Sequence, residues 1–130
     1  MIVSLHVASG AAAGSILDSR LGALVAGPVL HALGDRIPHR DIPSTRFETI
    51  TGIGALGLVA LRHGPFSPAV IGAVASSIPD VEHVAPLPRP GGRKLFPSHR
   101  LTGWHRRGGV PAWVQLVAAG TLLGYTLSRR

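Results

Sequence analysis

The way in which the apolar segments end is the feature that most constrains the fold of this chain. The first stretch rich in Ala, Gly, Leu and Val ends at Asp18-Ser19-Arg20, and the next three are stopped by proline or glycine. Each holds about 12 to 17 apolar residues. Proline removes a backbone donor and glycine favours helix ends, so these residues divide the chain into short helices. We therefore expect an all-α fold, a compact bundle of about five apolar helices in a single domain covering residues 1 to 130.

The apolar pattern also predicts where the helices lie. They are expected over residues 3 to 17, 21 to 37, 45 to 63, 67 to 78 and 111 to 127. Pro28 should bend or divide the second helix, while Thr45 and Glu48 fit a capping box at the start of the third. A long basic loop, residues 84 to 109, precedes the last helix. That helix, at roughly eighteen residues, is the candidate for a membrane span.

One predicted helix end carries imidazoles and carboxylates. His31 and Asp35 stand four residues apart, so in a helix their side chains share one face, with Cβ atoms about 5–6 Å apart. Pro38 ends this helix and directs His39 and Asp41 into a loop that can fold back toward the same face. These four side chains can bind one cation together. The alternative is an ordinary polar helix end with a salt bridge.

A second cluster follows another helix end. Asp80, Glu82 and His83 come directly after an Ile-Pro pair, and the same pair precedes His39. Four of the six acidic residues thus lie within four residues of a histidine, which chance placement would not favour. This concentration favours a shared metal site, for which His6 on the first predicted helix is a further candidate ligand. Because the chain contains no cysteine, such a site would use N and O ligands alone.

The region after Glu82 is strongly basic and contains no acidic residue. The chain carries a formal net charge of +7, and this region contributes Arg89, Arg93, Lys94, Arg100, Arg106, Arg107, Arg129 and Arg130. Such a charge predicts an anionic partner, which could be a phosphoester substrate, membrane lipid or nucleic acid. His99 and His105 lie among these arginines near Trp104, as a phosphate-ester site requires. A basic loop on a membrane surface, with Trp104 as interfacial anchor, is the alternative.

The order of these motifs resembles that of the bacterial and archaeal membrane-bound metal-dependent hydrolases. This family is regarded as distantly related to zinc-dependent phospholipase C and the zinc single-strand nucleases. The resemblance covers nearly the whole chain and is carried by His6, by His31 and Asp35, by Pro79-Asp80-Val81-Glu82-His83, by His99-Arg100 and by His105. Two positions depart from the family pattern. Glu82 stands where Asp is usual, and one extra residue separates His99 from His105.

The resemblance implies a helical bundle around one to three divalent ions, most often Zn²⁺, that hydrolyses a phosphoester such as a phospholipid or a nucleotide with a metal-activated water. The implied ligands are His6, His31, Asp35, His39, Asp80, His83, His99 and His105. Asp41 or Glu82 would orient a ligand or act as general base, and Arg100 would offset charge on the phosphoryl group. The family also implies integral or tight association with a bacterial or archaeal cytoplasmic membrane.

Two other functions fit parts of the sequence. A non-enzymatic membrane protein could bind anionic lipid or nucleic acid through its basic loop, and that binding would survive chelation but fall with salt. A metal-free phosphatase of the lipid-phosphate type is suggested by Lys94, His99 and His105. That enzyme class needs a Gly before its central histidine and an Asp after its last one, and this sequence has neither.

Overall fold

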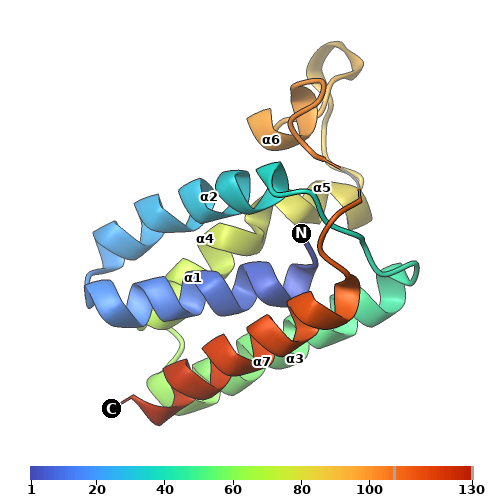
Figure 1. Cartoon of the computed structure of the whole chain (residues 1–130). Helices are drawn as coiled ribbons and strands as arrows, with labels where there is room; N and C mark the ends of the chain where they lie inside the picture. Colours follow the sequence, from blue (N-terminus) through green and yellow to red (C-terminus); the bar gives the residue numbers. More distant parts are fainter. Residues whose placement is uncertain (107, 130) are drawn as a thin grey trace.

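The computed structural model describes residues 1 to 106 and 108 to 129, which form a bundle of helices (Figure 1). The long helices are α1 (Val3–Leu17), α2 (Arg20–Arg36), α3 (Thr45–His63), α4 (Pro68–Ser77) and α7 (Ala112–Ser128). Shorter turns lie between α4 and α7: η1 (Ile78–Asp80), α5 (Val81–Val84), η2 (Pro90–Gly92) and α6 (Pro97–Arg100). The described residues contain no β-strand, so the predicted all-α bundle is confirmed. Arg107 and Arg130, counted above among the basic residues, lie outside the described residues.

One of the two alternatives for Pro28 and the predicted capping box are wrong. Helix α2 runs without interruption through Pro28, so this proline does not divide it into two helices. Helix α3 has the predicted bounds, but Ser44 is its N-cap and accepts a hydrogen bond from a backbone N–H of the first turn. Glu48 accepts instead from the Ile42 N–H at 3.1 Å. The capping box with Thr45 as cap therefore does not form, because the neighbouring serine takes that position.

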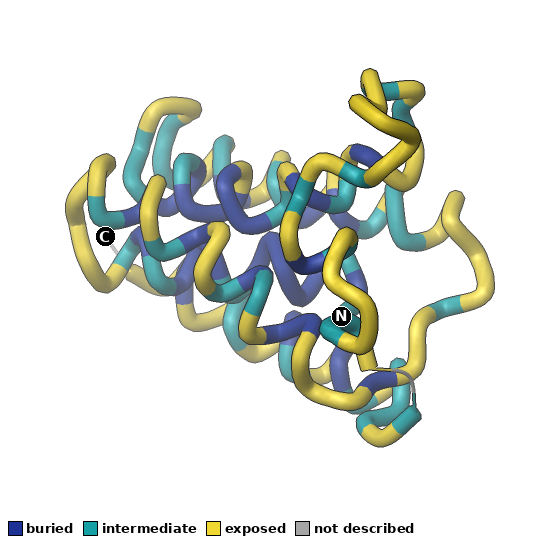
Figure 2. Tube along the Cα trace, turned by 90° about the horizontal axis from the view of Figure 1, so that it is seen from above, coloured by how far each residue is buried: buried dark blue, intermediate teal, exposed yellow. Residues whose placement is uncertain are grey.

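Helix α1 is the centre of the bundle. It packs against α2, α3, α4 and α7, and Figure 2 shows the buried residues concentrated along this middle layer. The closest approach is to α4: a Cβ atom at Gly10 would overlap the carbonyl oxygen of Gly72, and one at Gly14 would overlap that of Pro68. Gly10 and Gly14 therefore let the backbones of α1 and α4 approach closely. Gly120 and Gly124 on α7, by contrast, have open space where a Cβ would lie.

The segment between α5 and α7 folds over the C-terminal end of α2, above the bundle in Figure 1. It was predicted as one long basic loop, but it contains η2 and α6. Trp104 fixes it to α2, because its indole N–H donates to the Ala32 carbonyl at 2.9 Å and the Arg36 guanidinium lies 4.9 Å from its ring centroid. These contacts give Trp104 a structural role within the fold.

The membrane predictions are wrong. Among the residues that the structure describes, none of the helices combines the length and the apolar character that a membrane crossing requires. Helix α7 has 17 residues, which at the rise of an α-helix span about 26 Å, while a hydrocarbon core measures about 30 Å. The structure therefore overturns the transmembrane helix predicted over residues 111 to 127 and the predicted membrane location.

Candidate metal centre

The predicted ligands come together at one end of the bundle, beside the chain start marked N in Figure 1. There the first turn of α1 meets the last turns of α2 and the short turns that follow α4. Segment by segment, α1 contributes His6, α2 contributes His31 and Asp35, the segment after α2 contributes His39 and Asp41, η1 contributes Asp80, α5 contributes Glu82 and His83, α6 contributes His99, and the segment after α6 contributes His105.

Asp35 is the centre of this cluster. Its side chain is only 1% exposed, and the predicted contact across one helical turn is present, since His31 Nε2 lies 3.1 Å from Asp35 Oδ2. The same oxygen lies 3.3 Å from His99 Nε2 and 3.7 Å from His105 Nδ1. The other carboxylate oxygen lies 3.2 Å from His6 Nε2. One carboxylate thus joins imidazoles from α1, α2, α6 and the segment after α6.

Three of the imidazoles are held in the same way, through Nδ1, the ring nitrogen that faces away from the centre of the cluster. Each Nδ1 faces an acceptor oxygen and must donate its hydrogen there, so in the neutral ring Nε2 keeps a lone pair directed into the cluster. Metal-binding histidines in proteins are oriented by this kind of outer hydrogen bond. The pairs are His31 with the Ser76 carbonyl at 2.9 Å, His39 with the Ile37 carbonyl at 2.6 Å, and His99 with Glu82 Oε1 at 2.6 Å.

The donor atoms fit a divalent ion. His31 Nε2 and His99 Nε2 lie 3.3 Å apart, and they lie 3.1 and 3.3 Å from Asp35 Oδ2. Zinc bonds of about 2.0–2.2 Å at tetrahedral angles place ligand atoms about 3.3–3.6 Å apart. Asp35 Oδ2 is buried and has no hydrogen-bond partner within the described part of the chain. When both imidazoles are neutral, these three atoms are acceptors in contact, and a cation stabilises such an arrangement.

Neighbouring donor sets overlap with this one. The cluster offers four groups whose ligand atoms lie within 4.8 Å of one another, and these groups share residues, so they are adjacent positions in one centre. His6 joins two of the acids, since its Nε2 lies 3.2 Å from Asp35 and 4.0 Å from Asp80. His6 Nδ1 and Asp80 Oδ2 are also buried without hydrogen-bond partners in the described residues. Buried His and Asp groups at this end of the bundle could therefore hold a metal ion.

Burial and charge set the protonation of these ligands. Burial lowers the pKa of His6 to about 3 and that of His83 to about 4, so both imidazoles are neutral at pH 7. Burial raises the pKa of Asp80 to about 6. Burial alone would also raise the pKa of Asp35, but its contacts with the surrounding histidines outweigh this and hold the pKa well below its usual range. Burial would lower the pKa of His99, but its hydrogen bonds to Asp35 and Glu82 outweigh this and raise it. The centre of the cluster is thus an anion near the neutral imidazoles of His6 and His83.

The two acids predicted for catalysis have different surroundings. Glu82 is 2% exposed, and both of its oxygens are used, one by His99 Nδ1 and the other by the Leu95 N–H at 2.9 Å. Asp41 is 51% exposed, and its carboxylate lies 3.1 Å from His39 Nε2 and 3.8 Å from His105 Nε2. Glu82 is placed to orient a ligand, whereas Asp41 is open to a substrate or a water.

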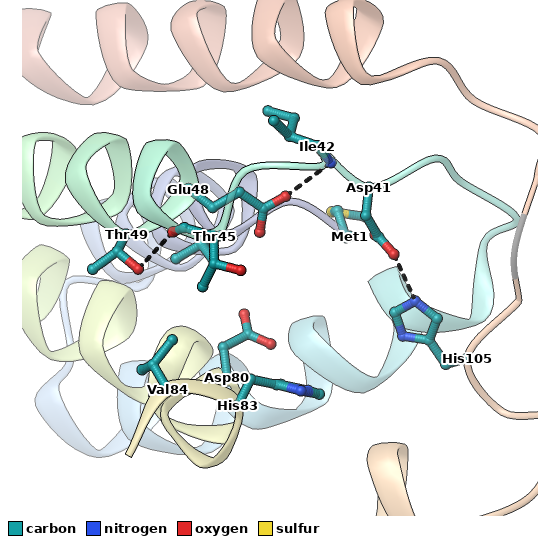
Figure 3. A pocket seen from close by; sticks show the side chains of 11 residues that line it. Met1, Asp41, Ile42, Thr45, Glu48, Thr49, Asp80, His83, Val84 and His105 are labelled. Atoms are coloured by element: carbon teal, nitrogen blue, oxygen red, sulfur yellow. Dashed lines mark hydrogen bonds and ion pairs between the residues drawn. The ribbon is translucent and has the colours of Figure 1, made fainter.

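Two hollows give access to the cluster. A cavity of about 220 Å³ is lined by Asp41, Glu48, Asp80, His83 and His105, and Figure 3 shows the Asp80 carboxylate pointing into it. On the side of α6, a second hollow of about 510 Å³ has a basic lining that includes Arg93, Lys94, His99 and Arg100. The predicted phosphate-binding residue Arg100 therefore lies beside a cluster histidine.

The sequence did not reveal the main-chain atoms of the cluster. The amino nitrogen of Met1 donates to Asp35 Oδ1 at 2.8 Å and contacts His39 Nε2, and the Ser76 carbonyl orients His31. No side-chain pattern signals such groups, because tertiary packing alone brings them there. His63 lies at the end of α3, away from the cluster, where its Nε2 contacts the Thr126 carbonyl at 2.9 Å.

Comparison with known proteins finds no family model, no curated protein and no solved structure that matches this chain significantly. The functional assignment is therefore argued from the geometry of the cluster and from the order of its motifs.

Proposed function

We propose that this chain is a metal-dependent hydrolase of phosphoesters and that Zn²⁺ is the ion its donor set favours. The observation that carries the proposal is the contact among His31 Nε2, His99 Nε2 and Asp35 Oδ2, which are three acceptors when both imidazoles are neutral. Three N and O ligands that leave one position open are typical of catalytic zinc sites. The order of the motifs, which resembles that of the metal-dependent hydrolases named above, supports the same assignment.

The proposal assigns one to three ions to the overlapping donor groups. An ion held there would supply Lewis acidity toward water and toward phosphoryl oxygens. Glu82 is the positioning residue of the proposal, because its bond to Nδ1 fixes the ring of His99 with Nε2 facing Asp35. Asp41 is the proposed general base, since it is half exposed beside His39 and His105 at the mouth of the cavity.

The basic segment between α5 and α7 is the proposed site for the anionic part of the substrate. Arg93, Lys94 and Arg100 line the hollow that includes His99. Guanidinium groups bind phosphoryl oxygens in pairs and offset the negative charge that develops on them. Lys94 Nζ also lies 3.4 Å from His83 Nδ1, so a positive charge extends to the edge of the cluster. A phosphoester is therefore favoured over a neutral ester.

Metal content and phosphoester hydrolysis test the proposal together. The purified protein should contain at least one equivalent of zinc by elemental analysis, and it should hydrolyse bis-p-nitrophenyl phosphate. Chelation should abolish the activity and added zinc should restore it. Asp35→Asn should lose both metal and activity. The matched control is Asp18→Asn, because Asp18 lies at the exposed end of α1 with a φ of 45°, where Asn is well tolerated.

The two rival functions predict different results. A chain that binds no metal, and that retains salt-sensitive binding to anionic vesicles or nucleic acid in the presence of chelator, would contradict the proposal and favour a non-enzymatic basic protein. Hydrolysis that survives exhaustive chelation and the Asp35→Asn change would favour a metal-free phosphatase instead.

A further inference from the structure

An apolar groove lies along α1, between α3 and α4. It encloses about 310 Å³, within the range of small-molecule sites, and its lining residues include Val3, Val7, Ile53, Leu56, Val74 and Val84. Gly52 also lines it, and because a Cβ atom there would come within 2.6 Å of Val3 Cγ1, this glycine lets α3 pack closely on α1 at the floor of the groove. The groove is thus a cavity lined by apolar side chains.

This groove is continuous with the cavity at the metal centre. Both are lined by Val3, Thr49, Asp80 and Val84. Asp80 marks the junction, since its carboxylate lies 3.7 Å from His99 Nε2 and points into the cavity of Figure 3. An apolar group lying in the groove would therefore end within reach of the cluster ligands.

Several large apolar side chains that line the groove are exposed to solvent. Ile53 is 66% exposed, Val84 is 55%, Ile78 is 43% and Val81 is 42%. Covering such surface with an apolar ligand is favourable in proportion to the area removed from water. The far side of the cluster is cationic, since Lys94 contacts His83 and shares a hollow with Arg93 and Arg100. The site thus joins an apolar end to a positively charged end.

We propose that the substrate is an amphiphilic phosphoester, with its phosphoryl group at the metal centre and a single alkyl chain in the groove beside α3. This inference rests on the proposed function, because the metal centre fixes the position of the head group. A nucleotide would place a polar sugar or base in the groove, where the described lining offers mostly aliphatic side chains.

Non-hydrolysable alkylphosphonates of increasing chain length test this inference. Zinc-loaded protein is titrated calorimetrically with ethyl-, hexyl- and decylphosphonate below their critical micelle concentrations. Affinity should rise about two- to fourfold for each methylene that the groove covers, so decylphosphonate should bind at least 100-fold more tightly than ethylphosphonate. A nucleoside monophosphate should bind no more tightly than ethylphosphonate.

Charged substitutions show whether the groove is responsible. Ile53→Asp and Val84→Asp introduce a carboxylate at exposed positions of the groove, so both variants should fold, and both should weaken decylphosphonate binding at least tenfold more than ethylphosphonate binding. Leu61→Asp is the matched control, because Leu61 lies on the same helix, is 88% exposed and is not among the groove residues.

The outcomes separate this inference from the proposed function. If zinc binds but affinity does not depend on chain length, or if Leu61→Asp weakens decylphosphonate binding as much as Ile53→Asp does, the alkyl-chain site is refuted and the metal centre stands. If the nucleoside monophosphate binds as tightly as decylphosphonate, the proposed substrate class is wrong. If no zinc binds, the proposed function itself fails.

Discussion

Asp35→Asn is the change that tests the metal centre most directly. Asp35 belongs to two of the four donor groups and is almost completely buried, while asparagine has the same size and lacks the negative charge. An ion at 100 times its Kd stabilises the folded state by about 2.7 kcal/mol. For 130 residues the entropy of unfolding is about 0.27 kcal/mol/K, so zinc should raise the Tm of the wild-type chain by about 10 °C.

The variant should lose most of this stabilisation. If the loss of the central carboxylate weakens zinc binding about 100-fold, the same zinc concentration gives only about 0.4 kcal/mol, a Tm shift under about 2 °C. Thermal unfolding by circular dichroism, with chelator and then with added zinc, measures both shifts. Asp18→Asn should behave like the wild type. A zinc-dependent shift of about 10 °C that persists in Asp35→Asn would show that the ion binds elsewhere and would refute the cluster as the metal site.

Three further changes test other parts of the structure. Glu82→Gln weakens the hydrogen bond that orients His99 and should reduce zinc affinity about 10- to 100-fold in a chelator competition assay. Glu48→Gln, which changes a carboxylate bonded to a backbone N–H, should leave zinc affinity unchanged. Equal losses of affinity in both variants would contradict an orienting role for Glu82. Gly10→Ala forces a methyl group onto the Gly72 carbonyl and should destabilise the folded state by about 1–3 kcal/mol in urea unfolding. Gly120→Ala, whose methyl group meets open space on α7, should be neutral or stabilising. A Gly10→Ala variant as stable as the wild type would contradict the close packing of α1 on α4. Because burial lowers the pKa of His6 to about 3, the unfolded state binds a proton below pH 6.5 that the folded state rejects, so this group should cost the metal-free protein up to about 1.4 kcal/mol per pH unit between pH 6 and 4. His83 adds a loss of the same sign and Asp80 offsets it, so the wild type is compared with His6→Gln by urea unfolding, and an equal pH dependence in both would show that His6 is not buried as a neutral ring.

The helices themselves could be predicted from the sequence. Ser67 accepts a hydrogen bond from the Val70 N–H and Pro68 starts α4, as their order along the chain indicates. His31 and Asp35 meet across one turn of α2 because residues four apart share a helix face. Such signals act over a few residues and need no information about the rest of the fold. The length of α7 also follows from local signals, but its 17 residues span only about 26 Å, less than a hydrocarbon core of about 30 Å, so the prediction of a membrane span is wrong.

The candidate site needed the tertiary structure. The sequence indicated which side chains carry metal chemistry, but the packing of α1 on α4 and the folding of the α6 segment over α2 decided that His6, Asp35 and His99 share one centre. The Met1 amino nitrogen, the Ser76 carbonyl and the groove beside α3 had no sequence signature at all. Hydrophobic periodicity and helix caps are local properties of the chain, whereas a donor cluster depends on contacts between residues far apart in it, and only the folded backbone determines those.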